Sequence, residues 1–585
     1  MKIKNHFCDV LIAGAGAAGL RTAAALLEES RDIRVSLVVK GLYGRCGTTA
    51  NAVSDRMAFH ATMPYTPPPT GDNWKYHAED IFRIGRYVSD LPLAGILAKE
   101  SSSAVYYLDK IGVPFVKDEK GEPVQFLTDG SVYPRACYTG PYTASDMEKH
   151  LVKRLKVFSP KVYERHMIAD VLTDKKGRVS GAVCIGPDNS VNIFNAGFVV
   201  LATGGAGGIF KDNCYPSGMT GDGYGAALRC GAELVNMEFI QFGLCSRKLK
   251  VACSGSLMRS IPRIVDDSGE EVLADVYRNP RDAFSVIFRK GASWPVSNEE
   301  ESRILDILAS RKGRLFLDYT ENPSGWKSGS IPEEVRKWYG EKGFGLKAER
   351  PWERLMFINP EIYRHFLKRG VDISRERVEV FGAAQHFQGG IKIDANGESS
   401  VGGLFACGES AGGQHGANRP GGNALLDTQV FGRRVAFEIL RRLKKKAEPA
   451  LNSSGVRVFP EKYKGSFPEK ELKKALGRTR KENSLHLAVH REKEELGRLK
   501  DTLVSMKEKV KPSENLRLYF ETFNAILTSL AVVGGCLART ESRGPHLMWL
   551  KGRVIPSDKS MDFSYFVSRL QNGDMTISRR KVKKR

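Results

Sequence analysis

Features of a metal centre or of a secreted, disulfide-bonded protein are missing from this sequence. Its ten cysteines include no CxxC pair and no metal-ligand spacing, and several lie in apolar segments typical of reduced core residues. The N-terminal stretch MKIKNHFCDV lacks the regions of a signal peptide and leads straight into an expected strand. We therefore expect a cytoplasmic protein with no metal site of its own.

Long hydrophobic runs are also scarce. The uncharged run most similar to a membrane span covers residues 522–538, which is 17 residues and the lower edge of what a membrane span needs. It contains Asn524, Thr528, Ser529 and two glycines. We interpret it as a buried helix and expect no integral membrane segment, with association to a membrane only through partners.

Acidic residues are outnumbered by basic ones, with 90 Lys and Arg against 67 Asp and Glu in 585 residues, a net charge of +23. The surplus is scattered apart from the terminal RRKVKKR, residues 579–585, which we interpret as a solvated tail. No basic stretch interleaved with aromatics and no reading helix supports nucleic-acid binding, so we expect none. The 41% of apolar residues indicates two or three globular domains.

Glycine-rich turns follow three expected strands. Residues 8–29, CDVLIAGAGAAGLRTAAALLEE, form a strand, a GxGxxG turn and a helix, which is the βα unit that binds a dinucleotide pyrophosphate. Residues 198–210 and 402–413 repeat the strand-and-glycine pattern. The second strand ends at Lys40, where an acidic residue for a ribose is usual, and this departure weakens the case for NAD.

These turns predict an α/β fold: a Rossmann-like nucleotide-binding domain in two pieces, with an inserted α+β capping domain and a C-terminal helical domain. Leucines and other apolar residues recur at helical spacing from Leu485 to Val510, Pro512 stops this run, and a second helix follows from Ser513. We place the boundaries as follows: residues 1–242 plus 373–445 for the nucleotide domain, 243–372 for the capping domain, 455–545 for the helical domain and 546–585 for the tail.

Four separated motifs resemble one known family. They are ATGGAGGIF with TGDGYGAALRCGAELVNMEFIQF, then HFQGGIKID, GLFACGESAGGQHGANRPGGNALLD and ARTESRGPH. Together, over residues 8–546, they are similar to the flavoprotein subunit of succinate dehydrogenase and fumarate reductase, to which L-aspartate oxidase is closely related. The resemblance implies FAD as the cofactor and a Rossmann-like FAD-binding domain.

The resemblance also implies which residues hold FAD. The glycine turn would bind the pyrophosphate, Asp222 and Glu409 would lie against the cofactor, and the helix that starts at Asn423 would direct its N-terminus at the flavin. Some relatives attach FAD to a His, but Gly47 stands at that position, so we expect non-covalent FAD. The full expected set is Gly14, Gly16, Ala18, Gly19, Lys40, Thr48, Thr49, Thr203, Gly204, Gly205, Asp222, Glu409, Asn423, Ala424 and Leu425.

Three residues carry the chemistry that the resemblance implies, which is hydride transfer between flavin N5 and a C=C or CH–CH group next to a carboxylate. Arg281, followed by Asp282, corresponds to the family's proton-shuttling Arg. His386 and Arg419 correspond to residues that bind a substrate carboxylate, the Arg through a forked pair of hydrogen bonds. The substrate is therefore expected to be a small carboxylic acid.

The other end of the expected substrate site departs from the family. Gly243 replaces a His, and Ser254 can mimic a Thr but is not followed by the family's Glu. Losing two charge-assisted bonds, each worth roughly 1.5–3 kcal/mol, would weaken binding of a C4 dicarboxylate about a hundredfold to ten-thousandfold. Unless Arg247 or Arg259 substitutes, we expect a different far end on the substrate.

Two alternatives stay open. L-aspartate oxidase, which oxidises a C–N bond, normally keeps the His that Gly243 replaces. The chain could instead be an electron-transferring subunit. Because the sequence has no cysteine cluster, any iron–sulfur or other electron-transfer partner would be a separate chain. The presence of Arg281, His386 and Arg419 together favours catalysis.

Overall fold

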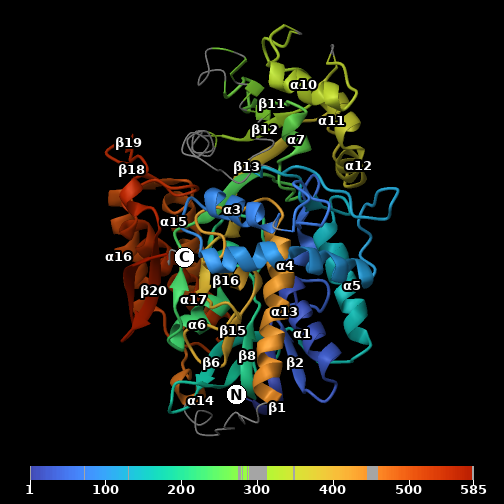
Figure 1. The fold of residues 1–585 in the computed structure, drawn as a ribbon. Helices are drawn as coiled ribbons and strands as arrows, with labels where there is room; N and C mark the ends of the chain where they lie inside the picture. The colour runs from blue at the N-terminus through green and yellow to red at the C-terminus, as the bar shows by residue number, and fades with distance from the viewer. Residues whose placement is uncertain are drawn as a thin grey trace.

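The computed structural model of this chain shows a central sheet, parallel except for β6 and β7 at one side, that is flanked by helices (Figure 1). It describes residues 2–582 except 72, 129–130, 274–278, 280, 283, 286, 289–307, 309–312, 328, 347–348 and 445–458. Within these residues the central sheet has seven strands, which are β5 (Lys161–Glu164), β2 (Val35–Val39), β1 (Ile3–Ala13), β8 (Val191–Leu201), β7 (Val179–Ile185) and β6 (Met167–Thr173) in spatial order, with β15 (Leu404–Ala406) also paired to β8.

The parallel strands bring the three glycine-rich turns to one edge of this sheet. β1 pairs in parallel with β2 and β8, and β15 pairs in parallel with β8. The carboxyl ends of parallel strands lie together, and ligands bind in the crevice outside them. Helices α1 (Ala17–Glu29) and α13 (Asn423–Lys444) start from two of the turns and pack against each other. The predicted α/β fold assembled from separated pieces is confirmed.

A second sheet, separate from the central one, forms the base of the inserted region. Its strand order is β10 (Ile240–Ser246), β13 (Val378–Phe387), β12 (Leu315–Asp318) and β11 (Arg263–Val265). The helices α7 (Ser256–Arg259), α10 (Glu333–Glu341), α11 (Pro351–Ile358) and α12 (Pro360–Lys368) cluster beyond this sheet, at the top of Figure 1. The insertion is thus α+β, and β10 and β13 connect it to the central domain.

The remaining elements of the N-terminal half surround the central sheet. They are α2 (Gly47–Asn51), β3 (Phe59–His60), α3 (Trp74–Ile84), α4 (Leu91–Lys110), β4 (Ala136–Cys137), α5 (Thr143–Lys156) and α6 (Asp222–Arg229).

The C-terminal region contains three long helices, α15 (Glu469–His486), α16 (Lys493–Lys509) and α17 (Leu516–Ala538), preceded by the short α14 (Phe459–Lys462). The expectation of a single helix from Leu485 to Val510 is wrong. The strand β17 (His490–Glu492) interrupts this segment and pairs with the strand at residues 547–550. Helix α17 is long and apolar enough to cross a membrane, but 83% of its most apolar window is buried in the protein. This burial is that of a core helix, as the uncharged run predicts.

The segment expected to be a tail forms strands instead. β18 (Leu547–Leu550) and β19 (Arg553–Val554) extend the sheet that β17 starts, while β20 (Ser564–Gln571) and β21 (Asp574–Lys581) form a hairpin. That hairpin extends a sheet with β9 (Leu234–Val235), β14 (Gly390–Lys392) and β16 (Ala411–Gly412). The expectation of a solvated basic tail is wrong up to Lys581, where β21 ends. Arg580 in this strand makes two hydrogen bonds of 2.6 and 2.8 Å to Glu233. Residues 583–585 lie outside the described residues.

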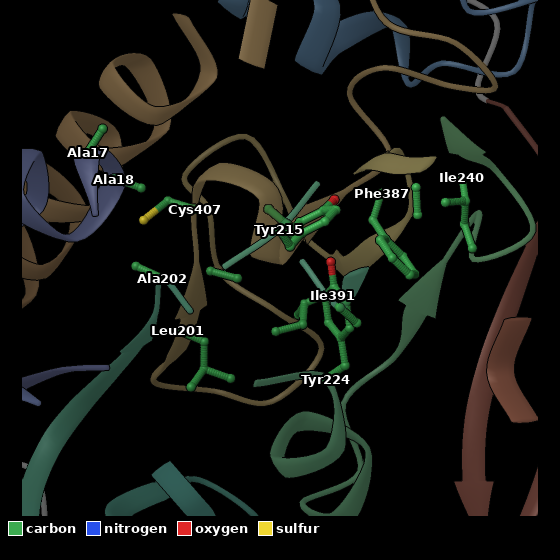
Figure 2. Packing of buried hydrophobic residues seen from close by; sticks show 14 of the residues in the cluster. Ala17, Ala18, Leu201, Ala202, Tyr215, Tyr224, Ile240, Phe387, Ile391 and Cys407 are labelled. Carbon is green, nitrogen blue, oxygen red and sulfur yellow. The ribbon is translucent and has the colours of Figure 1, made fainter. Parts of the chain in front are cut away.

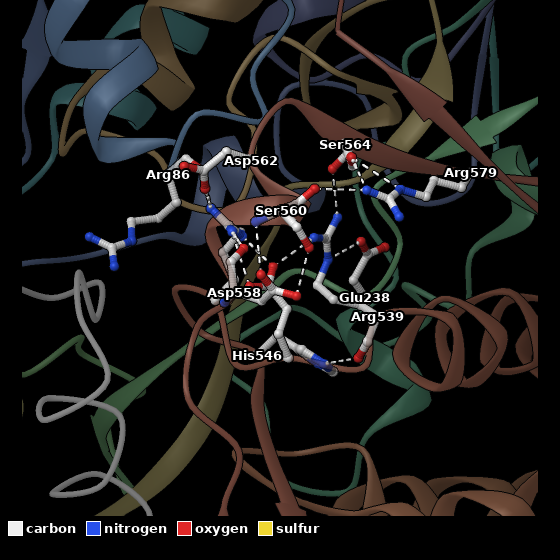
Figure 3. Close-up of polar contacts among 11 residues, drawn as sticks. Arg86, Glu238, Arg539, His546, Asp558, Ser560, Asp562, Ser564 and Arg579 are labelled. Carbon is white, nitrogen blue, oxygen red and sulfur yellow. Dashed lines mark hydrogen bonds and ion pairs between the residues drawn. The ribbon is translucent and has the colours of Figure 1, made fainter.

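A buried ionic network attaches this hairpin to the rest of the protein (Figure 3). Arg539 contacts Glu238 at 2.9 Å and Glu541 at 3.2 Å, and it donates to the Ser564 carbonyl at 3.0 Å. Arg543 pairs with Glu541 and with Asp562. The charged residues of the ARTESRGPH motif therefore have a structural role here, because they pair with one another and with Glu238 and Asp562 inside the fold.

Candidate active site

One cavity of about 1050 Å³ lies along the carboxyl edge of the central sheet. One end is formed by the first glycine turn and the strand end at Lys40, and the other by Arg419, His386 and the base of the insertion. Most of the predicted site residues line it: Gly14, Gly16, Ala18, Lys40, Thr48, Thr49, Thr203, Gly204, Gly205, Asp222, Ser254, His386, Glu409, Arg419, Ala424 and Leu425.

The glycine turn brings the chain close to strand β8 and to the N-terminus of α1. Gly14 has φ +107°, and a Cβ on it would lie 2.1 Å from the Ala202 carbonyl oxygen. A Cβ on Gly19 would lie 2.0 Å from the Gly14 oxygen, so Gly19 permits packing and does not line the cavity. The Ala17 N–H donates to Thr49 Oγ1 at 3.2 Å. This end presents helix N–H groups and a hydroxyl, which are the donors that a pyrophosphate needs.

A half-buried cluster of charges lies where an acidic residue after β2 is usual. Lys40 Nζ contacts Asp222 Oδ2 at 2.7 Å and Glu521 Oε1 at 2.9 Å. Asp222 also accepts hydrogen bonds from Thr220 and Asn524. Glu521 comes from α17 and lines the cavity. The sequence reasoning missed Glu521, because a glutamate in a distant apolar helix gives no local signal of a ligand site.

Glu409 is held at the middle of the cavity by aromatic neighbours. Its Oε1 accepts hydrogen bonds from the Tyr215 hydroxyl and from the Phe387 N–H, the latter at 2.9 Å. The Tyr224 hydroxyl donates to the Glu409 carbonyl oxygen at 2.7 Å. Figure 2 shows Tyr215, Tyr224 and Phe387 together in this part of the core. Burial raises the pKa of the Glu409 carboxyl.

Arg419 is fixed at the opposite end from the glycine turn. It lies just before α13 and donates to Gln241 Oε1 at 3.0 Å and to the Pro420 carbonyl at 2.9 Å. Within the described residues its buried Nε has no hydrogen-bond partner. Removal from bulk water lowers the pKa of Arg419 to about 10, so the guanidinium is charged at neutral pH. It is a preset cation with a donor left for an anionic ligand.

His386 lies close to Arg419, in strand β13, which pairs with the strand β10 that contains Gln241. It pairs in register with Gln241, which itself accepts from Arg419. Burial, and then the charge of Arg419, hold the pKa of His386 well below its usual range, so the ring is neutral. Its ring centre is 6.3 Å from that of His415, and His386 Nδ1 and both His415 ring nitrogens are buried without a partner in the described part of the chain. The sequence reasoning did not include His415.

The N-terminus of α13 faces the cavity through Ala424 and Leu425. The side chain of Asn423 does not, because its Oδ1 contacts His60 Nδ1 at 2.9 Å and His77 Nε2 at 3.2 Å. Asn423 therefore fixes the start of the helix through His60 and His77, and it does not belong to the residues that line the cavity.

Arg281 is not brought to the cavity. Its side chain is exposed, donates to the Gly329 carbonyl at 2.9 Å, and does not belong to the residues that line the cavity. Arg247 is also elsewhere, in ion pairs with Asp212 and Glu379. Arg259, by contrast, lines the cavity and lies over the ring of Trp338 at 5.2 Å. The structure thus joins His386 and Arg419 but leaves Arg281 apart from them.

The far end of the site contains a residue that the sequence reasoning missed. A Cβ on Gly243 would lie 2.6 Å from Gln385 Nε2, so the Gln385 amide occupies the space beside the position where the family has a His. Gln385 lines the cavity next to His386 in the sequence. Its proximity to Gly243 depends on the β10–β13 pairing, which the sequence alone does not specify.

Comparisons with known proteins identify the family of this chain and the fold that it shares. The profile of the family described as FAD binding domain matches residues 9–425. The chain is 29% identical over 564 residues to one of the subunits of the fumarate reductase (CoM/CoB) of Methanothermobacter marburgensis, covering 93% of this chain and 95% of that protein. It is 30% identical over 437 residues to L-aspartate oxidase of Streptomyces coelicolor, covering 74% of this chain and 68% of that protein. The solved structure of Mycobacterium smegmatis Sdh1 in complex with UQ1 shares the fold, with a TM-score of 0.80 and 24% identity over 99% of this chain and 95% of that one.

Proposed function

Because the chain belongs to the FAD-binding family of fumarate reductase and succinate dehydrogenase flavoproteins and L-aspartate oxidases, and is therefore an FAD-dependent oxidoreductase, we propose that it interconverts a C=C and a CH–CH group next to a carboxylate. FAD, when bound, supplies the hydride acceptor or donor of this reaction. In the reducing direction the alkene gains a hydride and a proton and becomes the saturated acid.

The cavity has the donors and acceptors that FAD requires. The α1 N-terminus and Thr49 suit the pyrophosphate, Glu409 and the Lys40–Asp222 pair suit hydroxyl groups, and the α13 N-terminus suits the flavin ring. We propose non-covalent binding, since Gly47 has no side chain to form a bond. Acid precipitation of the holoprotein should release all flavin into the supernatant, and flavin that stays on the precipitated chain would contradict this.

The single observation that carries the catalytic proposal is the placement of Arg419. It lines the cavity and is charged, and its buried Nε has no partner among the described residues, while its two Nη atoms are fixed by hydrogen bonds. A substrate carboxylate on this guanidinium would withdraw electron density from the adjacent double bond. His386, neutral beside it, would donate one further hydrogen bond to the same carboxylate.

Proton transfer is proposed for Arg281 on the family resemblance. Since Arg281 lies outside the cavity here, this role requires the insertion to move toward the central domain. Arg259 is a guanidinium of the insertion that already lines the cavity. The variants Arg281→Ala and Arg259→Ala separate the two: an unchanged reaction rate in Arg281→Ala would refute its role.

The test of the function is reoxidation of the anaerobically reduced holoprotein by unsaturated acids, followed at the flavin absorbance band. At least one acid should reoxidise the flavin much faster than buffer does. Fast reduction of the flavin by L-aspartate with no response to any alkene would instead favour the amino-acid oxidase alternative, which rests on the 30% identity to that relative.

We also propose that a separate chain delivers or accepts electrons. The ten cysteines include no CxxC pair or ligand spacing for an iron–sulfur relay, so a relay would lie on another polypeptide. We propose a cytoplasmic location, with any membrane attachment through such a partner. Affinity purification from the native host should then recover a redox partner with this chain, and recovery of the chain alone would contradict it.

A further inference from the structure

The far end of the cavity contains a carboxylate that no motif predicted. Asp55, in the segment after α2, accepts hydrogen bonds from the Ser256 N–H at 2.7 Å and the Ser256 hydroxyl at 2.9 Å. Both bonds reach Oδ2, which leaves Oδ1 for a ligand, and Asp55 lines the cavity. A Cβ on Gly255 would lie 2.2 Å from Asp55 Oδ2, so a larger residue at position 255 would displace this carboxylate.

Asp55 and Gln385 belong to the same wall. The Leu244 carbonyl accepts from Gln385 Nε2 at 3.4 Å and from the Cys253 N–H at 2.9 Å, which places the Gln385 amide beside the segment that continues into Ser254 and Gly255. Ser54 and Ala252 form a backbone bridge that fixes Asp55 against this segment. The far end of the cavity therefore offers a carboxylate, an amide and a hydroxyl.

Two cations that line the cavity, Lys250 and Arg259, make contacts to groups other than Asp55. Lys250 Nζ donates to the Tyr215 carbonyl at 3.0 Å, and the guanidinium of Arg259 lies over the Trp338 ring at 5.2 Å. In the described part of the chain no ion pair is formed by Asp55 within 4.0 Å. A second substrate carboxylate at this wall would meet a like charge in a site partly removed from water, and such pairs are destabilising.

We propose that the substrate is an unsaturated monocarboxylic acid whose far end carries an uncharged or cationic hydrogen-bond donor, such as a primary amide, which Asp55 and Gln385 bind. This inference rests on the proposed function and specifies its substrate class. The Arg419 end binds the carboxylate, and the amide N–H₂ donates to Asp55 while its C=O accepts from the Gln385 amide. The alkene gains a hydride and a proton as before, so an enoic monoamide becomes the saturated monoamide.

The test compares fumaramate, the monoamide of fumaric acid, with fumarate and crotonate as oxidants of the reduced holoprotein. We expect kcat/KM for fumaramate to exceed that for fumarate at least tenfold. Binding of the saturated analogues succinamate and succinate to the oxidised holoprotein, followed by the flavin absorbance change, should show the same order in Kd. Crotonate, which lacks a polar far end, should be slower than fumaramate.

Two variants test whether Asp55 and Gln385 cause the preference for fumaramate over fumarate. Asp55→Asn keeps an oxygen for Ser256 but removes the charge, and it should reduce the fumaramate-to-fumarate ratio at least tenfold. Gln385→Leu should weaken fumaramate more than crotonate. Asp212→Asn, which changes an aspartate paired with Arg247 outside the cavity, should leave the ratio unchanged.

The outcomes separate this inference from the proposed function. Rapid reoxidation by fumarate in preference to fumaramate, with Asp55→Asn having no effect on the ratio and Arg259→Gln abolishing it, would overturn the inference and leave the function standing. If no acid reoxidises the flavin while succinamate still binds at least tenfold more tightly than succinate, the function fails and the assignment of the wall stands.

Discussion

Replacing Arg419 by glutamine should remove the carboxylate-binding end of the site and leave the fold intact. The buried Nε of the wild-type guanidinium has no partner in the part of the chain that the structure describes, and the group is held in place by hydrogen bonds to Gln241 and to the Pro420 carbonyl. A forked pair of charge-assisted hydrogen bonds, each worth about 1.5–3 kcal/mol, gives a loss of roughly 3–6 kcal/mol in transition-state stabilisation. This corresponds to a decrease in kcat/KM of about a hundredfold to ten-thousandfold.

The assay is anaerobic stopped-flow reoxidation of the reduced flavin by the fastest acid, at several acid concentrations. Arg419→Lys keeps the charge without the fork and should lie between wild type and Arg419→Gln. Arg247→Gln is the matched control, because this arginine is exposed and pairs with Asp212 and Glu379 away from the cavity. Flavin content and thermal unfolding should be unchanged in all three proteins.

The pH dependence gives an independent check on the same residue. The pKa of Arg419 is lowered to about 10 by burial. Carboxylate binding needs the protonated guanidinium, so affinity should be constant below about pH 9 and fall as the pH rises through 10. A decrease in kcat/KM of less than threefold in Arg419→Gln, or an affinity independent of pH up to 11, would refute this account of the site.

Three further predictions concern stability and cofactor binding. Both carboxylate oxygens of Glu148 are buried without a partner in the described structure, and burial raises the pKa of this group to about 8 from 4.5. The free energy of unfolding should therefore fall by up to about 5 kcal/mol as the pH rises from about 4.5 to 8. Glu148→Gln should remove this fall when urea unfolding is compared at pH 5 and pH 9. Glu541→Gln removes the carboxylate that Arg539 and Arg543 share, while Glu238 and Asp562 remain as their partners, and it should cost up to about 3–5 kcal/mol. Glu461→Gln, which changes an exposed pair with Lys464, is the neutral control in the same unfolding assay. Gly14→Ala should abolish flavin retention on gel filtration, because the new Cβ would lie 2.1 Å from the Ala202 oxygen. The control Gly477→Ala has open space around the new Cβ and should retain flavin. Equal flavin binding by both variants would contradict the role of the turn.

The sequence predicted the central domain because its signals are local. A strand, a glycine turn and a helix follow one another at residues 8–29, and each part has a physical reason to form where it does. The position of Arg419 before α13 was predicted in the same way, from a motif continuous in the chain. The carboxyl edge of a parallel sheet then brings such turns together without further information.

The residues that the sequence did not predict depend on long-range pairing. Asp55 contacts Ser256, and Gln385 fills the space beside Gly243, only because strands and loops from the central domain and the insertion lie side by side. The C-terminal hairpin was missed although its signal is local: Asn572-Gly573 lies between the apolar residues of β20 and the alternating Met575 and Ile577 of β21. The basic residues 579–585 led to the interpretation of this segment as a tail, whereas Arg580 pairs with the distant Glu233.

The most direct test of the central claim is product analysis after one turnover. Stoichiometric fumaramate, fumarate or crotonate is mixed anaerobically with the reduced holoprotein, and the small molecules are identified by NMR. The account predicts one equivalent of a saturated acid for each equivalent of flavin reoxidised. Recovery of only the unsaturated acids, with the flavin still reduced, would contradict it.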